Sequence, residues 1–495
     1  MALVDPQTST RSLESTDLDR PLVRGIAWTG AARWSTQAVT WAATLVIARI
    51  LSPSDYGIFS LATLYLGFLS LVTEFGLGSA IVTIRNLTDL EIGQLNTLSV
   101  LLGFTGFGLT CVAAIPLARF FHTPPLAAVL AIMALGFVIA SLQSVPTALL
   151  QRDLDFKYIS LVDIAKSVSM TTVMLFLAFM GAGYWTLVFG SLVGAVVACT
   201  LTLAKRCHGF ALPKRSDLKR AVGFSWQVLV GRISWYGYSN SDFFVAGRVL
   251  GDVVLGYYSL AWNLANLPIE KMTTLIGSVT PGIYSAAQND KEALRRYVLK
   301  PVEAIGILIF PVMAGLAVVA SDAVPVVLGP KWTSAIVPLQ LLSIYACVRS
   351  VMPLLAQVLI ATGDSRFVMW ANISSLAIFP VVFWRASLNS GAVGIAAAWI
   401  LVYPLNAIPI FLRARNRIQL SSISFFKALW PGLSSTMLMV GSVLLLKLAI
   451  PARMPEVLRL LVLIAAGAVV YVSTILIVHR SRLGMFRTAF GLLRG

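Results

Sequence analysis

The sequence predicts an all-α polytopic membrane protein with about fourteen transmembrane helices. The chain has 495 residues, of which 58% are hydrophobic and only 12% are charged, and its mean hydropathy is +0.84. An ordinary soluble domain carries roughly 25% charged residues, so this chain has too little charge to cover a water-soluble globule. Two further observations, a series of long apolar segments and an internal sequence repeat, define the helices and their grouping.

Fourteen apolar segments follow one another from residue 25, and each is long enough to cross a hydrocarbon core of ~30 Å as a helix. The segments 255–286 and 334–361 are the weakest, because Glu270 and Lys271 interrupt the first and prolines interrupt the second. The connections are too short to hold a soluble catalytic domain. The segments are about 25–48, 57–80, 95–118, 126–148, 158–180, 184–204, 222–248, 255–286, 301–321, 334–361, 367–385, 391–412, 426–449 and 457–478.

The basic residues are distributed unevenly over these connections. Of the 38 Lys and Arg residues, 25 lie in the termini and the even-numbered connections, and 7 lie in or beside the odd-numbered ones. Since cytoplasmic loops of membrane proteins carry an excess of Lys and Arg, this bias predicts that both termini are cytoplasmic. It also accounts for the net charge of +17 without a nucleic acid partner.

The two halves of the chain resemble each other. An offset of 199 residues aligns 33–79 with 232–278, and eleven of the 47 positions are identical. A second offset of 209 aligns Pro116 with Pro325. Because helices 1 and 7 start on the same side, the repeats are parallel and related by an axis along the membrane normal. We therefore predict two parallel-repeat, six-helix lobes around a central cavity, plus two C-terminal helices.

The charge pattern and the repeat together divide the chain into six parts. Each lobe is preceded by a polar or basic segment, and a basic segment ends the chain. The parts are a cytoplasmic tail at 1–23, a first lobe at 24–204, a basic cytoplasmic linker at 205–221, a second lobe at 222–412, helices 13 and 14 at 413–480, and a basic cytoplasmic tail at 481–495.

The inventory of reactive residues argues against metal sites and disulfide scaffolds. Four cysteines are too few and too scattered for a disulfide framework, and of the three histidines only His208 adjoins a cysteine, Cys207. The chain also has no Gly-rich nucleotide-binding loop. We therefore expect no metal, no cofactor and no catalytic residue.

Several short motifs resemble those of a known transporter family. They are Arg49–Gly57 (RILSPSDYG), Glu74–Ser79 (EFGLGS), Val145–Phe156 (VPTALLQRDLDF), Asn240–Asp242 followed by Gly247–Gly251 (GRVLG), and Leu328–Trp332 (LGPKW). The order and spacing of these motifs is similar to that of Wzx-type polysaccharide flippases of the multidrug/oligosaccharidyl-lipid/polysaccharide exporter superfamily, and most similar to the colanic-acid and exopolysaccharide branch. The resemblance runs from about residue 22 to 480.

The resemblance implies a function as well as a fold. It implies that the protein flips undecaprenyl-diphosphate-linked oligosaccharide repeat units across the bacterial inner membrane, by alternating access between its two lobes, for exopolysaccharide or lipopolysaccharide biosynthesis. Membrane lipids and the polysaccharide polymerase or export machinery are the partners that it implies.

Basic residues inside the spans are candidates for binding the diphosphate and glycan. Arg33 and Arg232 are repeat-equivalent, and two guanidinium groups at equal depth suit a diphosphate because each can donate two parallel hydrogen bonds. Lys271 and Arg349 also lie within spans, where a charge is costly and normally faces a cavity or a partner. Snorkelling or a structural ion pair is the alternative. The repeat-equivalent Arg49 and Arg248 are further candidates, although a cation also suits a helix C-terminus.

Acidic and amide residues are candidates for ion coupling and gating. Asp242, with Asn240, is the leading site for coupling to H⁺ or Na⁺, because a shielded carboxylate can exchange a proton or ligate a cation. Alternatively, Asp242 neutralises Arg232 or Arg49. Glu74 lies at nearly the same depth as Lys271 and could bridge the lobes as a gate, whereas pairing within each lobe is the simpler interpretation.

Aromatic residues cluster on and beside helix 7. Sugar rings stack on such side chains, although most aromatic residues of membrane proteins form interface belts or pack against lipid. The cluster consists of Trp226, Trp235, Tyr236, Tyr238, Phe243 and Phe244.

Three other functions remain open at this point. A multidrug or small-cation exporter of the same superfamily should line its cavity with carboxylates, whereas the repeat-matched pair here is arginine. A membrane glycosyltransferase or polymerase would need a larger loop or domain. A lipid scramblase or a structural partner of an assembly complex would lack directional, energy-dependent transport.

Overall fold

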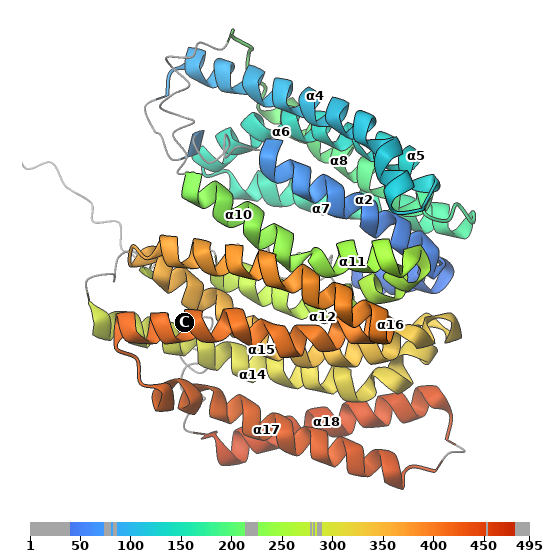
Figure 1. The fold of residues 1–495 in the computed structure, drawn as a ribbon, viewed down its shortest axis with the longest axis vertical. Coiled ribbons are helices and arrows are strands. Elements are labelled where there is room, and N and C mark those ends of the chain that lie inside the picture. Colours follow the sequence, from blue (N-terminus) through green and yellow to red (C-terminus); the bar gives the residue numbers. More distant parts are fainter. Residues whose placement is uncertain are drawn as a thin grey trace, which may run out of the picture.

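The protein is an assembly of long helices that lie side by side (Figure 1). This computed structural model describes residues 40–73, 81–82, 87–212, 226–277, 280, 283–284, 290–451 and 454–480. Within these ranges the chain is largely helical and contains no β-strand. The predicted all-α class is therefore confirmed.

The first lobe begins with a short helix, Thr40–Ile50, that is bent by 120° against the helix that follows it. A capping box starts α4, because the Thr88 hydroxyl accepts a hydrogen bond from the Glu91 amide and the Glu91 carboxylate accepts one from the Thr88 amide. The helices of this lobe are α2 (Pro53–Thr73), α4 (Asp89–Phe120), α5 (Pro125–Met133), α6 (Leu135–Arg152), α7 (Phe156–Phe179) and α8 (Trp185–Lys205).

The second lobe contains α10 (Trp226–Ser239), α11 (Ser241–Val249), α12 (Gly251–Gly277), α14 (Lys291–Ala323), α15 (Ile336–Ala361) and α16 (Ser365–Ile418). Two short turns, η1 (Val324–Leu328) and η2 (Pro330–Ala335), join α14 to α15. Helix α16 is broken at Ser390 and Gly391, where the backbone leaves the helical conformation and Gly391 has a φ of 58°. The C-terminal pair is α17 (Ser422–Ala449) and α18 (Glu456–Val478).

Each of the fourteen predicted spans has a helical counterpart among the described residues. Nine helices there are individually long and apolar enough to cross a membrane, or ten if the bent pair Thr40–Ile50 and Pro53–Leu71 counts as one span. The break divides α16 into two segments, which correspond to predicted spans eleven and twelve. The pair α10 and α11 corresponds to predicted span seven, and α12 corresponds to span eight. One predicted span, 126–148, is interrupted at Ala134, where α5 ends and α6 begins.

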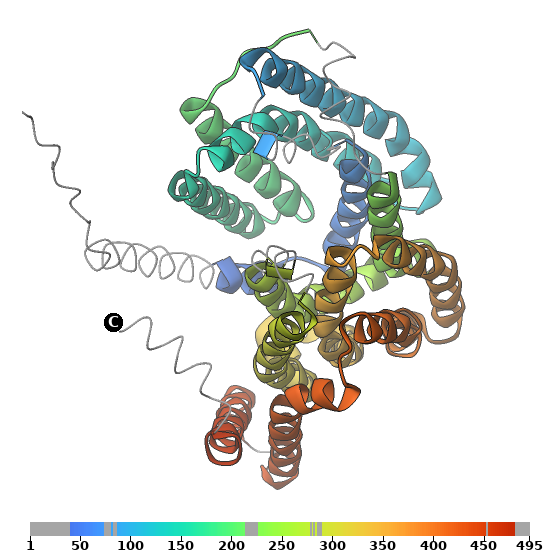
Figure 2. The same cartoon turned by 90° about the vertical axis from the view of Figure 1, so that its left-hand side faces the viewer.

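The two lobes lie against each other with the C-terminal helices outside them. Figure 2 looks along the helices and shows the first lobe above the second, with α17 and α18 on the far side of the second lobe. Helix α17 is joined to α14 by an ion pair of 2.5 Å between Lys447 and Asp322, and Arg459 approaches the same carboxylate at 3.1 Å. Ion pairs therefore attach α17 and α18, the predicted helices 13 and 14, to the second lobe.

The lobes meet through the two helices that the sequence repeat makes equivalent, α2 and α12. Gly57 and Gly256 are repeat partners. A methyl group at Gly57 would overlap the main-chain carbonyl of Asp252, and one at Gly256 would overlap that of Pro53, which is the repeat partner of Asp252. Reciprocal contacts of this kind are expected at a two-fold interface. The pseudo-two-fold axis between the lobes therefore passes through this crossing.

Most hydrogen bonds between the described parts of the lobes join residues 48–54 and 122 of the first lobe to residues 248–252 and 326–332 of the second lobe. They include a bond from the buried Trp332 indole to the Ala48 carbonyl at 2.8 Å and one from the Ser54 hydroxyl to the Asp252 carboxylate. A further bond joins the Tyr236 hydroxyl to the Leu64 carbonyl in the middle of α2, at 2.8 Å. We call the end of the molecule formed by the turns at residues 51–52, 121–124, 250 and 329–335 the closed end.

Substitution of the crossing glycines should destabilise the protein. Gly57→Ala or Gly256→Ala forces a methyl group into a main-chain carbonyl, and overpacking of this kind costs about 1–3 kcal/mol. We expect a lower melting temperature of the purified protein for both variants. Gly108→Ala in α4 is the matched control, because a Cβ there meets nothing within 4 Å, and it should leave the melting temperature unchanged or raise it. Equal melting temperatures for all three variants would contradict this packing.

Candidate functional site

A cavity of about 570 Å³ lies between the lobes and is lined by both of them. The wall from the first lobe consists of hydroxyl and apolar side chains of the helix Thr40–Ile50, α2, α7 and α8. The wall from the second lobe carries the amides and the two charged groups. Its residues are Trp235, Tyr236, Ser239, Asn240, Phe243, Trp262, Asn263, Asn266, Glu270 and Arg349.

Arg349 is the one basic residue among the described residues that line this cavity. Its Nη1 donates a hydrogen bond of 2.8 Å to the Asn266 side-chain oxygen, and its guanidinium carbon lies 5.1 Å from the centre of the Trp262 ring. Asn266 in turn donates to the Glu270 carboxylate at 2.5 Å. The amide therefore stands between the two charges, and no ion pair of Arg349 is present in the described part of the chain.

This arrangement suits the guanidinium to binding an anion. A ring face and an amide fix its orientation through a cation–π contact and a hydrogen bond, and no carboxylate of the described residues pairs with it directly. The rigid fork of an arginine matches phosphate geometry. Arg349 lies on the wall of the cavity, and its binding of an anion stays a prediction.

Asp242 does not line the cavity and is completely buried. Its Oδ2 accepts hydrogen bonds from the Tyr258 hydroxyl at 2.6 Å and from the Trp399 indole nitrogen at 2.9 Å, whereas its Oδ1 has no hydrogen-bond partner. No ion pair of Asp242 is present among the described residues, so it neutralises neither Arg232 nor Arg49 there. Aromatic rings enclose the carboxyl group, with Trp262 and Tyr345 packed against Trp399.

Asn240 and Asp242 are close in sequence but face different surroundings. Asn240 interrupts the helix between α10 and α11, lines the cavity, and donates to the Tyr236 carbonyl at 2.9 Å. Asp242 is the second residue of α11 and is buried in the core of the second lobe. No hydrogen bond joins the two side chains, so they do not form one ligand set in this conformation.

The remaining predicted residues lie away from the described cavity or outside the described residues. Arg232 is exposed on α10 and does not line the cavity. Arg33 and Glu74 lie outside the described residues, and only the backbone of Lys271 is described, within α12. The pairing of Arg33 with Arg232 and the gate between Glu74 and Lys271 therefore stay predictions.

Arg49 and Arg248 lie at the closed end rather than in the cavity. Arg49 donates to the Val326 carbonyl at 2.9 Å, and Arg248 donates to the His122 Nδ1 at 3.1 Å. Each arginine therefore crosses from its own lobe to the other lobe.

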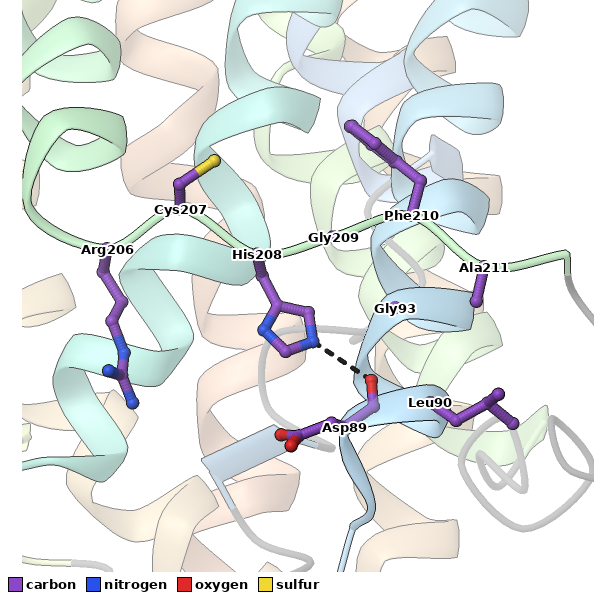
Figure 3. A pocket seen from close by; sticks show the side chains of 9 residues that line it. All are labelled: Asp89, Leu90, Gly93, Arg206, Cys207, His208, Gly209, Phe210 and Ala211. Atoms are coloured by element: carbon purple, nitrogen blue, oxygen red, sulfur yellow. Dashed lines mark hydrogen bonds between the residues drawn. The ribbon is translucent and has the colours of Figure 1, made fainter.

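A second pocket lies at the opposite end, where the segment after α8 crosses the start of α4 (Figure 3). The His208 Nε2 contacts the Asp89 carbonyl at 3.1 Å, and Asn96 donates to the His208 carbonyl at 3.2 Å. Cys207 points away from His208 (Figure 3). No group of three or more metal-ligating side chains occurs within the described residues.

Sequence reasoning missed the residues that position Arg349 and Asp242. Trp262, Asn266 and Glu270 are spaced by four along α12, which places them on one helical face, and this spacing could have indicated a polar stripe. Trp399 and Tyr258 gave no such signal, because a single aromatic residue in an apolar span is indistinguishable from packing.

Comparison with known proteins agrees with this architecture. The chain is 26% identical over 424 residues to the lipopolysaccharide biosynthesis protein WzxC of Escherichia coli K12, covering 82% of this chain and 84% of that protein. It is 25% identical over 477 residues to the succinoglycan biosynthesis transport protein ExoT of Rhizobium meliloti, covering 94% of each.

Solved structures share the fold at low sequence identity. The inward closed conformation of the lipid II flippase MurJ superposes with a TM-score of 0.74 at 14% identity, over 92% of this chain and all of that one. An inward-facing multidrug transporter of the MATE family superposes with a TM-score of 0.65 at 16% identity, over 77% of this chain and 94% of that one.

The family assignment rests on the sequence itself. A sequence profile of the family described as polysaccharide biosynthesis protein matches residues 46–337, which is more than half of the chain. Family and fold together indicate a membrane transporter rather than an enzyme. The chain belongs to the polysaccharide biosynthesis protein family.

Proposed function

We propose that the protein flips undecaprenyl-diphosphate-linked oligosaccharide repeat units from the cytoplasmic to the periplasmic leaflet of the bacterial inner membrane. Both termini are cytoplasmic in this proposal, so the closed end faces the periplasm and the lobes alternate in opening to the two sides. The flipped units supply a polysaccharide polymerase or export machinery. The placement of Arg349 on the cavity wall is the observation that carries the proposal.

The cavity offers suitable contacts for both parts of such a substrate. Its volume falls within the range of roughly 300–1,000 Å³ that is usual for ligand sites. Arg349 suits the diphosphate, while Trp235, Tyr236 and Trp262 offer ring faces to sugars. The amides of Asn240, Asn263 and Asn266 add neutral hydrogen-bonding groups, which suit hydroxyl-rich glycans.

We also propose that transport is coupled to protons at Asp242 rather than to sodium. Hard cations need several oxygen ligands, whereas an indole nitrogen can only donate and Trp399 occupies the position of a ligand. An ionised carboxylate buried without a cation costs several kcal/mol, so burial favours the protonated carboxyl in this conformation. Release of the proton then requires a conformation in which water reaches Asp242.

Reconstitution tests the proposal directly. The purified protein is placed in proteoliposomes with an undecaprenyl-diphosphate-linked oligosaccharide, and transfer between leaflets is followed by a glycosidase that reaches one side only. We expect protein-dependent transfer that a proton gradient makes directional. Transfer without any response to a gradient would indicate a scramblase. Transport of a cationic dye with no transfer of the glycolipid would support the alternative of a small-cation exporter.

A further inference from the structure

The closed end is held by two arginines that occupy equivalent positions in the sequence repeat. Arg49, near the end of the helix Thr40–Ile50, donates from Nη1 to the Val326 carbonyl at 2.9 Å, within η1 just after the end of α14. Arg248, in the last turn of α11, donates from Nη1 to the His122 Nδ1 at 3.1 Å, in the turn after α4. Its guanidinium carbon also lies 5.1 Å from the centre of the Phe120 ring.

The two contacts lie in related places under the pseudo-two-fold axis. The repeat aligns the end of α4 with the end of η1, since Pro116 matches Pro325 and Phe120 therefore matches Gly329. Each arginine therefore reaches the end of the equivalent helical segment of the opposite lobe, although the two acceptors are not at aligned positions. The acceptors differ, however, because Arg49 binds a main-chain carbonyl and Arg248 binds an imidazole nitrogen.

This difference makes only one of the contacts sensitive to pH. A guanidinium group can only donate, so the hydrogen bond from Arg248 requires that Nδ1 of His122 carries no proton. Histidine is the residue type whose charge ordinarily changes between pH 5 and 8, whereas a main-chain carbonyl does not titrate. Protonation of His122 would replace the hydrogen bond by a contact between two cations.

Other charged groups at the closed end do not compensate such a charge. Asp55 on α2 and Asp252 on α12 accept hydrogen bonds from serine hydroxyls, and Lys331 on η2 donates to the carbonyls of residues 50 and 51. Arg119, in the last turn of α4, is a further cation, and its carbonyl accepts from the His122 amide at 3.2 Å. No carboxylate pairs with His122 among the described residues.

We propose that the contact between Arg248 and His122 is a protonation-sensitive latch between the lobes. Acidification on the side that this end faces breaks the latch and favours opening there, while the Arg49 contact, whose acceptor does not titrate, contributes the same stabilisation of the closed end at every pH. The inference deepens the proposed function, because it rests on alternating access and assigns a residue that makes the opening step respond to acid. It concerns only the opening of the closed end and requires no bound substrate.

Distance measurements across the closed end test the latch. The four native cysteines are replaced by serine, and spin labels are attached to cysteines at Ile115 and Ser334, which are exposed residues of opposite lobes. Pulsed electron paramagnetic resonance then gives the distance distribution in lipid nanodiscs at pH 8 and pH 5.5. We expect the ratio of long to short distances to rise several-fold at pH 5.5.

His122→Asn separates the latch from other effects of pH. His122 has a φ of 54°, a conformation that asparagine tolerates, and the Asn oxygen takes the position of Nδ1 without titrating. This variant should keep the short distance at both pH values. Arg49→Ala is the matched control, and it should lengthen the distances at both pH values while keeping the response to pH.

Two outcomes would overturn the latch. One is a full response to pH in His122→Asn, and the other is no response in the protein that retains His122. If His122→Asn does not fold, Arg248→Gln serves instead, since a neutral partner removes the repulsion and should weaken the response. The labelled protein is measured without glycolipid, so failure of the latch leaves the proposed substrate untouched, and failure of glycolipid transfer leaves the latch untouched.

Discussion

Arg349→Gln should reduce glycolipid transfer by roughly ten- to a hundredfold while the protein remains folded. A hydrogen bond to a charged group contributes about 1.5–3 kcal/mol, and 1.4 kcal/mol corresponds to a tenfold change in an equilibrium constant. Glutamine can still bond to Asn266, so the wall of the cavity is retained and only the positive charge is lost. The rate of leaflet transfer in proteoliposomes measures the effect, with the melting temperature as the check on folding.

Two further variants determine whether charge or geometry matters. Arg349→Lys keeps the charge but loses the planar fork. We therefore expect its rate of transfer to lie between the rates of the parent and of Arg349→Gln. Arg385→Gln is the matched control, because Arg385 is an exposed arginine of α16 that does not line the cavity, and it should transfer at the parental rate. Equal transfer by Arg349→Gln and the parent would remove Arg349 from the site.

Asp242→Asn should abolish the accumulation of glycolipid that a proton gradient drives, whereas the effect of acid on opening through His122 should remain. Asparagine has the same shape, and its side-chain oxygen can still accept from Tyr258 and Trp399, but it cannot exchange a proton. Transfer down a glycolipid gradient should persist, because the cavity is unchanged. The measurement compares accumulation with and without an imposed proton gradient, and a gradient-driven accumulation equal to that of the parent would show that another group carries the proton.

Asp242→Ala distinguishes proton exchange from a structural role. It removes the acceptor of the Tyr258 hydroxyl, and a buried donor left unpaired costs about 1–3 kcal/mol, whereas the Trp399 indole nitrogen loses Asp242 but keeps the Tyr258 hydroxyl oxygen at 3.1 Å. We expect a clearly lower melting temperature for Asp242→Ala than for Asp242→Asn. If both variants melted like the parent, Asp242 would contribute little to the packing of the second lobe.

The helical fold was predictable because lipid constrains a sequence so strongly. A segment that spans the membrane must satisfy its backbone hydrogen bonds internally, so long apolar segments become helices whatever their neighbours are. The repeat also made Gly57 and Gly256 equivalent, and the structure shows that both lie at the same crossing. The breaks inside segments, such as the one at Ser390 and Gly391, depend on local backbone geometry that hydropathy does not report.

The candidate site was predictable only residue by residue. Arg349 and Asp242 were candidates because a charge inside a span is costly and normally faces a cavity or a partner. The sequence could not show that Asp242 is surrounded by aromatic rings while Arg349 faces a cavity. That distinction depends on which side of a helix meets another helix, and in apolar spans the usual alternation of polar and apolar faces is too weak to reveal it.

The sequence by itself determined the helical class, the duplication into two lobes and the short list of charged residues from which a site could be built. Only the tertiary structure decided that Arg49 and Arg248 join the lobes at the closed end, and that Asn266 and Trp262 orient Arg349. The physical reason is the range of the interactions. Hydropathy and helix formation act along the chain, whereas a hydrogen bond such as that between Arg248 and His122 joins residues 126 positions apart and exists only once the helices have packed.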